Sequence, residues 1–336
     1  MPISTINTNS IADDVFQANK NLIINGAMQV AQRGTSVAGI TAGGYKALDR
    51  FDIDLSSAGT WTISQDTDVP AGFGSSMKFL CTAADASLGS TDRIAFRQKF
   101  EGQDLQQLKK GTTAAKTFTV SFYVKSNKTG TYILEFYDLN NSRHINKSYT
   151  IISAATWEYK TITFDADTNG AFNNDPNASA QLQFWLGAGS AYTSGSLQTS
   201  WGANVTANRA VGNVNLADST SNEWQITGVQ LEVGEQATPF EHRSYGEELM
   251  LCGRYYQKSG ASQWMYPIST GNNGYRRTPV KFVPQLRATP TLTSTNIGSP
   301  TGFGPQHSSP VGTDFYADGM GDTGYLTMTW TADAEI

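Results

Sequence analysis

The sequence is poor in charge, in cysteine and in long apolar runs. Charged residues make up 16% of its 336 residues, whereas an average domain has about 25%. Its 24 basic and 29 acidic residues give a net charge of −5, and Lys and Arg form no run. Nucleic-acid-binding proteins need a basic footprint, so we expect no nucleic-acid partner. No segment approaches the roughly 18 consecutive apolar residues of a membrane span, so we expect no membrane insertion.

Sites built on cysteine or histidine are not expected either. Cys81 and Cys252 lie in different predicted elements without CxxC spacing, which argues against a disulfide framework and a zinc site. We expect both to be small buried hydrophobic side chains. His144, His242 and His307 form no HxxxH pair. The sequence therefore predicts no metal site and no cofactor.

The N-terminal residues, MPISTINTNSIADDVF, are polar and irregular. They contain neither the cationic segment nor the apolar segment of a secretory signal, so we expect no export by a peptide of the protein's own. They also lack a sustained hydrophobic period. We therefore expect an extended arm at this end of the chain.

Glycine is abundant, with 32 residues, and Ser, Thr and Asn accompany it. Thr suits a pleated surface, while Gly and Asn supply the positive φ angles of tight turns. From Thr60 to Val233 apolar residues alternate with polar ones, most clearly over residues 118–125 and 132–137. We expect about nine short strands there, separated by Gly, Asn and Asp clusters and with no helical period between them. This pattern predicts an all-β fold, an antiparallel jelly-roll sandwich.

Two irregularities lie near the end of this region. Trp224 and Ile226 share one phase, but the next apolar residues are shifted by one position across Thr227 and Gly228. A β-bulge at Gly228 would turn these apolar residues back toward the core.

The Ser-, Gly- and Asn-rich segment from Gly187 to Ser221 is too long for a plain turn, so we expect an ordered surface loop.

One helix is expected, and it divides the chain. Ser244 and Glu247 have the spacing of a capping box, and an apolar stripe follows from Tyr245 to Tyr256, before Gly260. Short alternating segments return after the helix. The predicted domains are an N-terminal arm and first strand (1–45), the jelly roll (46–243), a connector helix (244–260) and a small C-terminal β-sandwich-like domain (261–336).

The sequence offers no catalytic motif, but it does offer outward aromatic residues. It contains no GxSxG elbow, no phosphate-binding loop and no HExxH, so we expect no enzyme. Alternation places five residues on outer faces of strands, where they could stack on a sugar ring and bond its hydroxyls: Tyr123, Glu135, Tyr137, Gln183 and Trp185. These are the candidate glycan-binding residues. The alternative is that they contact a neighbouring subunit or lie under a loop, because aromatic residues are also enriched at protein interfaces.

Six strings carry a family resemblance. They are NLIINGAMQVAQRGTS (21–36), DRF (49–51), RQKFEG (97–102), SFYVKS (121–126), WEYKTITFDADTNG (157–170) and ITGVQLEVGEQATPFEHRSYGEELMLCGRYYQ (226–257). Over residues 20–260 they resemble a family of phage virion fibre proteins, and the last string is the most specific. The C-terminal strings FVPQLRATPTLT (282–293) and TADAEI (331–336) look like the small β module that often follows.

The resemblance implies a jelly roll similar to carbohydrate-binding modules, carried on a non-enzymatic tail fibre. The expected partners are a host surface polysaccharide, sister subunits in a homotrimer, and other virion proteins through the N-terminal arm. The expected location is the virion, after assembly in the host cytoplasm. An acidic residue often follows Gly26 in carbohydrate-binding relatives, but Ala27 stands there, so no calcium ligand is carried over.

Two alternatives to the tail fibre stay open at this point. One is a purely structural head-decoration spike or fibre adaptor. The other is a polysaccharide depolymerase, because a glycosidase needs only two correctly separated carboxylates.

Overall fold

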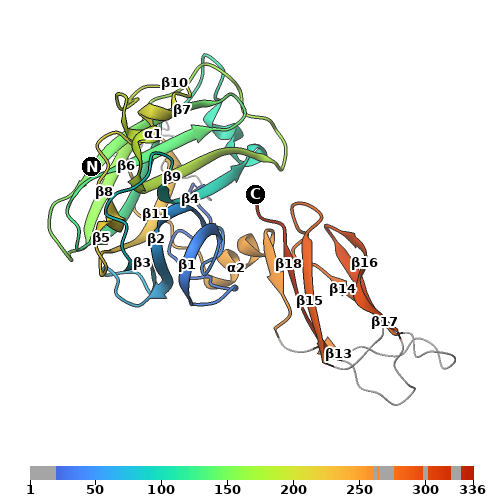
Figure 1. Ribbon diagram of the computed structural model, residues 1–336. Coiled ribbons are helices and arrows are strands. Elements are labelled where there is room, and N and C mark those ends of the chain that lie inside the picture. The colour runs from blue at the N-terminus through green and yellow to red at the C-terminus, as the bar shows by residue number, and fades with distance from the viewer. Residues whose placement is uncertain (1–19, 261–262, 265–275, 298–301, 319–326) are drawn as a thin grey trace, which may run out of the picture. The chain divides into compact units, whose positions relative to one another are not determined.

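The computed structural model describes residues 20–260, 263–264, 276–297, 302–318 and 327–336 (Figure 1). The chain divides into two compact units, Met1–Arg243 and Ser244–Ile336. The fold is all-β, with antiparallel sheets and a few short helices. Among the described helices, none has the length and apolar character needed to cross a membrane.

The strands of the first unit are β1 (Ser36–Tyr45), β2 (Asp52–Asp66), β3 (Ser76–Ala83), β4 (Arg93–Glu101), β5 (Phe118–Ser126), β6 (Gly130–Asp138), β7 (Arg143–Ile151), β8 (Glu158–Phe164), β9 (Ala178–Ala188), β10 (Gly202–Ala203) and β11 (Glu223–Val233). Short helical turns connect some of them: η2 (Gly102–Leu108), α1 (Ser190–Thr193), η3 (Thr206–Asn208) and η4 (Leu216–Asp218).

These strands form one hydrogen-bonded sheet that folds into two layers (Figure 1). The first layer has the order β10-β7-β6-β9-β4-β2, and the second has the order β2-β3-β11-β5-β8. Strand β2 belongs to both, because its residues 52–56 pair with β4 and its residues 60–66 pair with β3. The bend between the two halves contains Ser57 and Gly59, both with positive φ (49° and 77°). Strand β1 follows β2 around the same corner.

The core lies between the inner faces of the two layers. Phe118 and Phe122 of β5 face the first layer, where Phe118 contacts Phe136 at 4.7 Å between ring centroids and Phe122 contacts Phe184 at 5.0 Å. All four side chains are buried. Aromatic contacts of this kind contribute beyond the area that they remove from water. The free thiol of Cys81 is also buried in this core, as the sequence predicts.

Residues 20–45 pack onto the jelly roll. Ile23, Met28 and Ile40 belong to the same buried core as the strands. The Asn21 side chain ties this segment to β11, because its amide donates to Val229 O and its Oδ1 accepts from the backbone N–H of Leu231. The predicted arm before residue 20 lies outside the described residues.

A buried ion cluster joins the loops at one end of the two layers. The Lys110 ammonium has only 4% of its side chain exposed and contacts carboxylates of Asp138 at 2.6 Å and Asp167 at 3.0 Å. It also donates to the carbonyl oxygens of Asn169 and Gly170 at 2.7 Å. A buried ammonium is tolerated only with such complete pairing, so the cluster fixes the loop after β8 against the β6–β7 turn.

The second unit begins with α2 (Tyr245–Gly253) and continues with β12 (Tyr256–Lys258), β13 (Gln263–Trp264), β14 (Arg276–Lys281), β15 (Thr291–Ile297), β16 (Gly302–Ser309), β17 (Gly312–Asp318) and β18 (Thr327–Asp333). One sheet contains β12, β18, β13 and β15, and the other has the order β14-β17-β16. Its own core includes Phe282, Phe315, Met328 and Trp330.

The capping box at the start of α2 is confirmed, because Ser244 and Glu247 bond reciprocally. The predicted helix length is wrong, since α2 ends at Gly253 and Tyr256 already lies in β12. Gly253 ends the helix where a Cβ atom would lie 2.9 Å from the Pro284 ring. The second cysteine, Cys252, is also buried, as predicted.

The predicted β-bulge in β11 is confirmed. The register between β11 and β5 shifts between Thr227 and Gln230, and Gly228 has a φ of +63°. A Cβ atom on Gly228 would lie 2.6 Å from Cζ of Phe73. Two features of the position therefore require glycine: the positive φ angle and the Phe73 ring that packs against its Cα.

We predict that Gly228→Ala destabilises the first unit more than Gly72→Ala does. Both glycines have positive φ, but nothing lies within 4 Å of the Cβ position at Gly72. The control thus loses about 1–2 kcal/mol for the backbone conformation, and Gly228→Ala adds at least about 1 kcal/mol for displacing Phe73. Urea unfolding measures the difference. Equal losses for the two variants would contradict the role of the Phe73 contact.

Candidate functional site

Four of the five sequence-predicted site residues share the outer face of the first layer. Glu135 and Tyr137 lie on β6, while Gln183 and Trp185 lie on β9. Glu135 stands directly opposite Gln183 in the register. The residues between them in each strand belong to the core, so alternation turns these four away from it.

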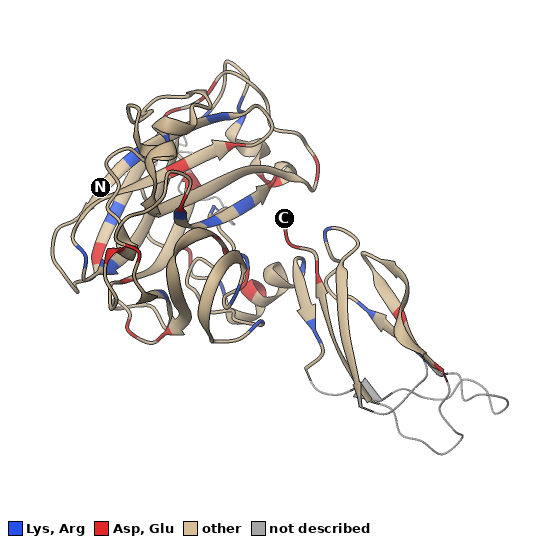
Figure 2. Cartoon of the chain, viewed as in Figure 1, with Lys and Arg blue, Asp and Glu red and all other residues tan. Residues whose placement is uncertain are grey.

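The register extends this face into two polar rows across the layer. One row contains Asp52, Arg97, Gln183, Glu135 and Asn146, on β2, β4, β9, β6 and β7. The row beside it contains Lys99, Gln181, Tyr137 and His144. We call these two rows the polar face. Basic and acidic residues are interspersed over the strands of this unit (Figure 2).

Arg209 closes one end of the polar face. It comes from the loop between β10 and β11 and bonds Glu135 with two nitrogens, at 2.7 and 2.8 Å. Its guanidinium carbon lies 4.9 Å from the centroid of the Tyr137 ring and 5.2 Å from that of Trp185. The indole N–H of Trp185 also donates to Glu135 at 3.1 Å. A planar guanidinium suits this arrangement, because it can bond a carboxylate and stack on rings at once.

The expected exposure of this set is wrong for three residues. Glu135, Gln183 and Trp185 are all fully buried. The reason is the loop after β9, the ordered loop that the sequence predicts, because Tyr192 lies 5.2 Å from Trp185 and Ala210 packs in the same cluster. Burial under a loop was the alternative that the sequence left open. Only Tyr137 of the four reaches solvent in part.

The charge of Glu135 is stabilised in this buried setting. Burial by itself raises the pKa of Glu135, but the charge of Arg209 and hydrogen bonds from His144 and Arg209 outweigh it, so the pKa is lowered from 4.5. The stability that this pairing contributes is present above pH 4.5 and is lost as the pH falls through the lowered value. A glycosidase acid needs the opposite shift. The cluster therefore favours a positioned carboxylate over a proton donor.

Solvent reaches the polar face over β4. The side chains of Arg97 and Lys99 are 20% and 22% exposed. Arg97 bridges Asp52 and Asp54 at 2.7 and 3.0 Å, so it is held in place by two carboxylates. The open part of the face thus presents cationic donors on β4 and the half-buried ring of Tyr137 on β6, with β9 between them.

Tyr123 does not join the other four predicted residues. It lies on β5, in the second layer, and its ring is 5.5 Å from Phe73 and 4.9 Å from Tyr159. Its neighbours Phe122 and Val124 belong to the core, so Tyr123 is on the outer face of that layer. The two layers therefore have separate outer surfaces with different chemistry.

Within the described residues, no group of three or more His, Cys, Asp or Glu side chains is arranged to hold a metal ion.

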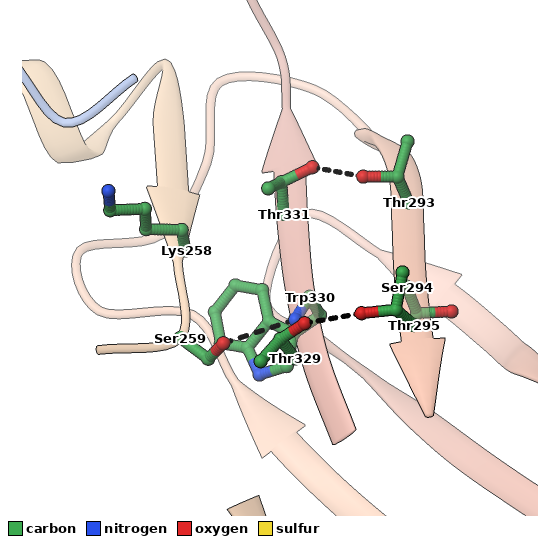
Figure 3. Close-up of a pocket in the computed structure, with 8 residues that line it drawn as sticks. All are labelled: Lys258, Ser259, Thr293, Ser294, Thr295, Thr329, Trp330 and Thr331. Atoms are coloured by element: carbon green, nitrogen blue, oxygen red, sulfur yellow. Dashed lines mark hydrogen bonds between the residues drawn. The ribbon is translucent and has the colours of Figure 1, made fainter. Parts of the chain in front are cut away.

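The second unit has a groove of about 320 Å³ beside β18 (Figure 3). Its lining comes from Lys258 and Ser259, from Thr293, Ser294 and Thr295 of β15, and from Thr329, Trp330 and Thr331 of β18. The hydroxyls of Thr295 and Thr329 bond each other at 2.6 Å, and Thr293 bonds Thr331 in the same way. Because these hydroxyls pair across the two strands, we assign the groove a structural role in joining β15 to β18.

Arg209 is the functional residue that the sequence reasoning missed. It is the single basic residue between Gly187 and Ser221. That isolation within a long polar loop is a signal that could have identified it, since a lone cation there needs a partner. Its partner lies 74 positions away in the sequence, on β6, which no local pattern indicates.

Comparison with known proteins reveals similarity in solved structures only. No family model matches the chain, and no curated protein matches it. The enzymatically active domain of tailspike protein 4 of bacteriophage CBA120 is 13% identical with a TM-score of 0.34, covering 64% of this chain and 21% of its own. This chain thus spans about a fifth of that one.

Two carbohydrate-binding modules of Clostridium thermocellum are also similar. The C-terminal family 22 module of Xyn10B is 8% identical with a TM-score of 0.33, covering 66% of this chain and all of its own. The family 11 module of the cellulase Lic26A-Cel5E is 12% identical with a TM-score of 0.29, covering 60% of this chain and 99% of its own. Similarity at this level carries no argument about function, and the fold stands on the strand register itself.

We predict that Arg209→Met destabilises the first unit by about 3–5 kcal/mol, because it leaves the Glu135 charge buried without its partner. The double variant Arg209→Met with Glu135→Gln recovers much of the loss, since no charge is then left unpaired. Arg93→Met is the control: Arg93 pairs with Asp54 at 3.0 Å but is 28% exposed, so its loss stays below about 1 kcal/mol. Urea unfolding provides the measurement. A double variant no more stable than Arg209→Met would contradict this account of the pair.

Proposed function

We propose that this chain is a non-enzymatic fibre protein of a phage virion that takes part in host attachment by binding a cell-surface glycan. The observation that carries the glycan part is the open part of the polar face, where the partly exposed side chains of Arg97 and Lys99 lie in the same two register rows as the partly exposed ring of Tyr137. Sugar recognition needs this combination of planar donors and acceptors with an aromatic ring.

The physical basis of binding lies at the open part of the face. Arg97 and Lys99 donate hydrogen bonds to ring and hydroxyl oxygens, and the partly exposed ring of Tyr137 contacts the C–H groups of a sugar. The guanidinium of Arg209 lies over the Tyr137 ring, so the ring is already ordered before the ligand arrives. Ordering in advance lowers the entropic cost of binding. Glu135 and Trp185 act as positioning residues under the loop.

The virion part of the proposal rests on the resemblance of the six strings to phage fibre proteins. In that arrangement the chain forms a homotrimer, and the N-terminal arm contacts other virion proteins. A fibre with three copies presents three polar faces, and simultaneous engagement raises the avidity without any new contact.

We predict that Tyr137→Leu weakens binding to host-cell polysaccharide about five- to twelvefold, since a stacked ring contributes about 1–1.5 kcal/mol. Tyr245→Leu is the matched control, because Tyr245 is an exposed tyrosine of the second unit. We expect the Tyr245→Leu variant to bind the polysaccharide with the wild-type affinity. Biolayer interferometry on immobilised polysaccharide gives both affinities. Equal affinity for Tyr137→Leu and wild type would contradict binding at the polar face.

We also predict that a tagged copy of the chain is found on intact phage particles at the tail, and that the purified chain has the mass of a trimer in light scattering. Label on the head would instead support the decoration spike. Particles without label and a stable monomer at micromolar concentration would contradict the fibre assignment.

A further inference from the structure

Five aromatic side chains meet on the outer face of the second layer, on the opposite side of the sandwich from the polar face. We call them the aromatic platform: Phe73, Tyr123, Tyr159, Phe240 and His242. Each ring contacts at least one other ring of the set, with centroids between 4.9 and 5.5 Å apart. They come from four separate segments of the chain, so the cluster is a product of the fold and of no single sequence motif.

The bulge in β11 gives the platform its shape. Gly228 leaves room for the Phe73 ring, which then lies against Tyr123 on the neighbouring strand. Tyr123 and Tyr159 face each other directly in the register of β5 and β8. The platform therefore continues from the bulge across two strands to β8, which ends the strand order of this layer.

Part of the platform is open to solvent. Tyr159 is 48% exposed, His242 is exposed, and the other three rings are half-buried. An ordered ring with an open surface meets the requirement for stacking, because little rotamer freedom remains to be lost on binding.

Three further side chains, Trp157, Asp68 and Lys125, border the aromatic platform. The indole N–H of Trp157 donates to Asp68 at 3.0 Å, and the Lys125 ammonium bonds the other oxygen of the same carboxylate. Hydrogen bonds from Lys125 and Trp157 hold the pKa of Asp68 below its ordinary value of 3.8, so the carboxylate is ionised near neutral pH. Each of its oxygens keeps a lone pair for a further donor. The Asp68 side chain is 46% exposed, so a ligand can reach it.

The composition of this surface favours a sugar over a protein partner. The set contains rings but no aliphatic side chain, and its border is an ionised carboxylate and a lysine. A stable protein interface buries about 800 Å² per partner, with an apolar core inside a polar rim. A pyranose is much smaller and has an apolar C–H face with hydroxyls at its rim, which matches an exposed ring beside a hydrogen-bond acceptor.

We propose that the aromatic platform is a second glycan-binding site, which stacks a neutral pyranose ring on Tyr159 and Tyr123 while Asp68 accepts hydrogen bonds from its hydroxyls. This inference takes its ligand class from the proposed function but uses none of the residues of the polar face. The chain then has two sugar sites on opposite faces. Two sites on one chain could engage two strands or two segments of a polysaccharide.

The test is the binding stoichiometry of neutral hexasaccharides, measured by isothermal titration calorimetry on the full chain. The probes are hexasaccharides of glucose, mannose and galactose. Wild type binds two equivalents of the active probe. Tyr159→Ala binds one equivalent, at the polar face, and Tyr137→Leu binds one equivalent, at the aromatic platform. Tyr159→Phe still binds two equivalents, because stacking needs the ring and not its hydroxyl. Asp68→Ala weakens the platform site at least about tenfold.

The outcomes separate the two proposals. One equivalent in wild type that is lost in Tyr137→Leu and kept in Tyr159→Ala overturns the aromatic platform and leaves the polar face in place. Binding that is lost in Tyr159→Ala and kept in Tyr137→Leu supports the platform and contradicts the polar face. No heat with any probe, together with no binding to host polysaccharide, overturns both. A change of oligomeric state in Tyr159→Ala without any sugar binding makes the platform a protein interface and also overturns the inference.

Discussion

The corner in β2 is the constraint on which the first unit depends. One half of this strand pairs with β4 and the other half with β3, so a single strand joins the two layers. The bend places Ser57 and Gly59 at positive φ, a conformation that suits short turns. Because the layers are connected there, their inner faces meet in one aromatic core and their outer faces point in opposite directions. The two candidate surfaces follow from that geometry.

The two outer faces achieve order by different means. On the first layer a loop supplies Arg209, whose pairing with Glu135 is buried and whose guanidinium stacks on Tyr137. On the second layer a backbone bulge makes room for Phe73, and the order comes from ring contacts. The low overall charge of the sequence is consistent with both proposed sites, because a neutral glycan needs little long-range electrostatic attraction.

The sequence predicts the fold better than it predicts the site, and the reason is the range of the interactions. Alternation within strands and the phase shift at Gly228 are local, so the sandwich, the bulge and the cap at Ser244 could all be read directly. Strand β7 alternates less clearly and β10 has only two residues, so the sequence pattern does not indicate either. The burial of Trp185 depends on Tyr192 and Ala210, which come from a loop. Lys110 forms ion pairs with Asp138 and Asp167, which are distant from it in the sequence. Such contacts form between segments whose proximity only the register reveals.

The central claim is that this chain binds a glycan on its outer faces, and a crystal structure of the chain with a bound oligosaccharide of the host polysaccharide tests it most directly. We predict sugar density in contact with Tyr137 on the first layer and with Tyr159 on the second. Density confined to the groove beside β18, or none on either outer face under conditions of saturating ligand, would contradict it.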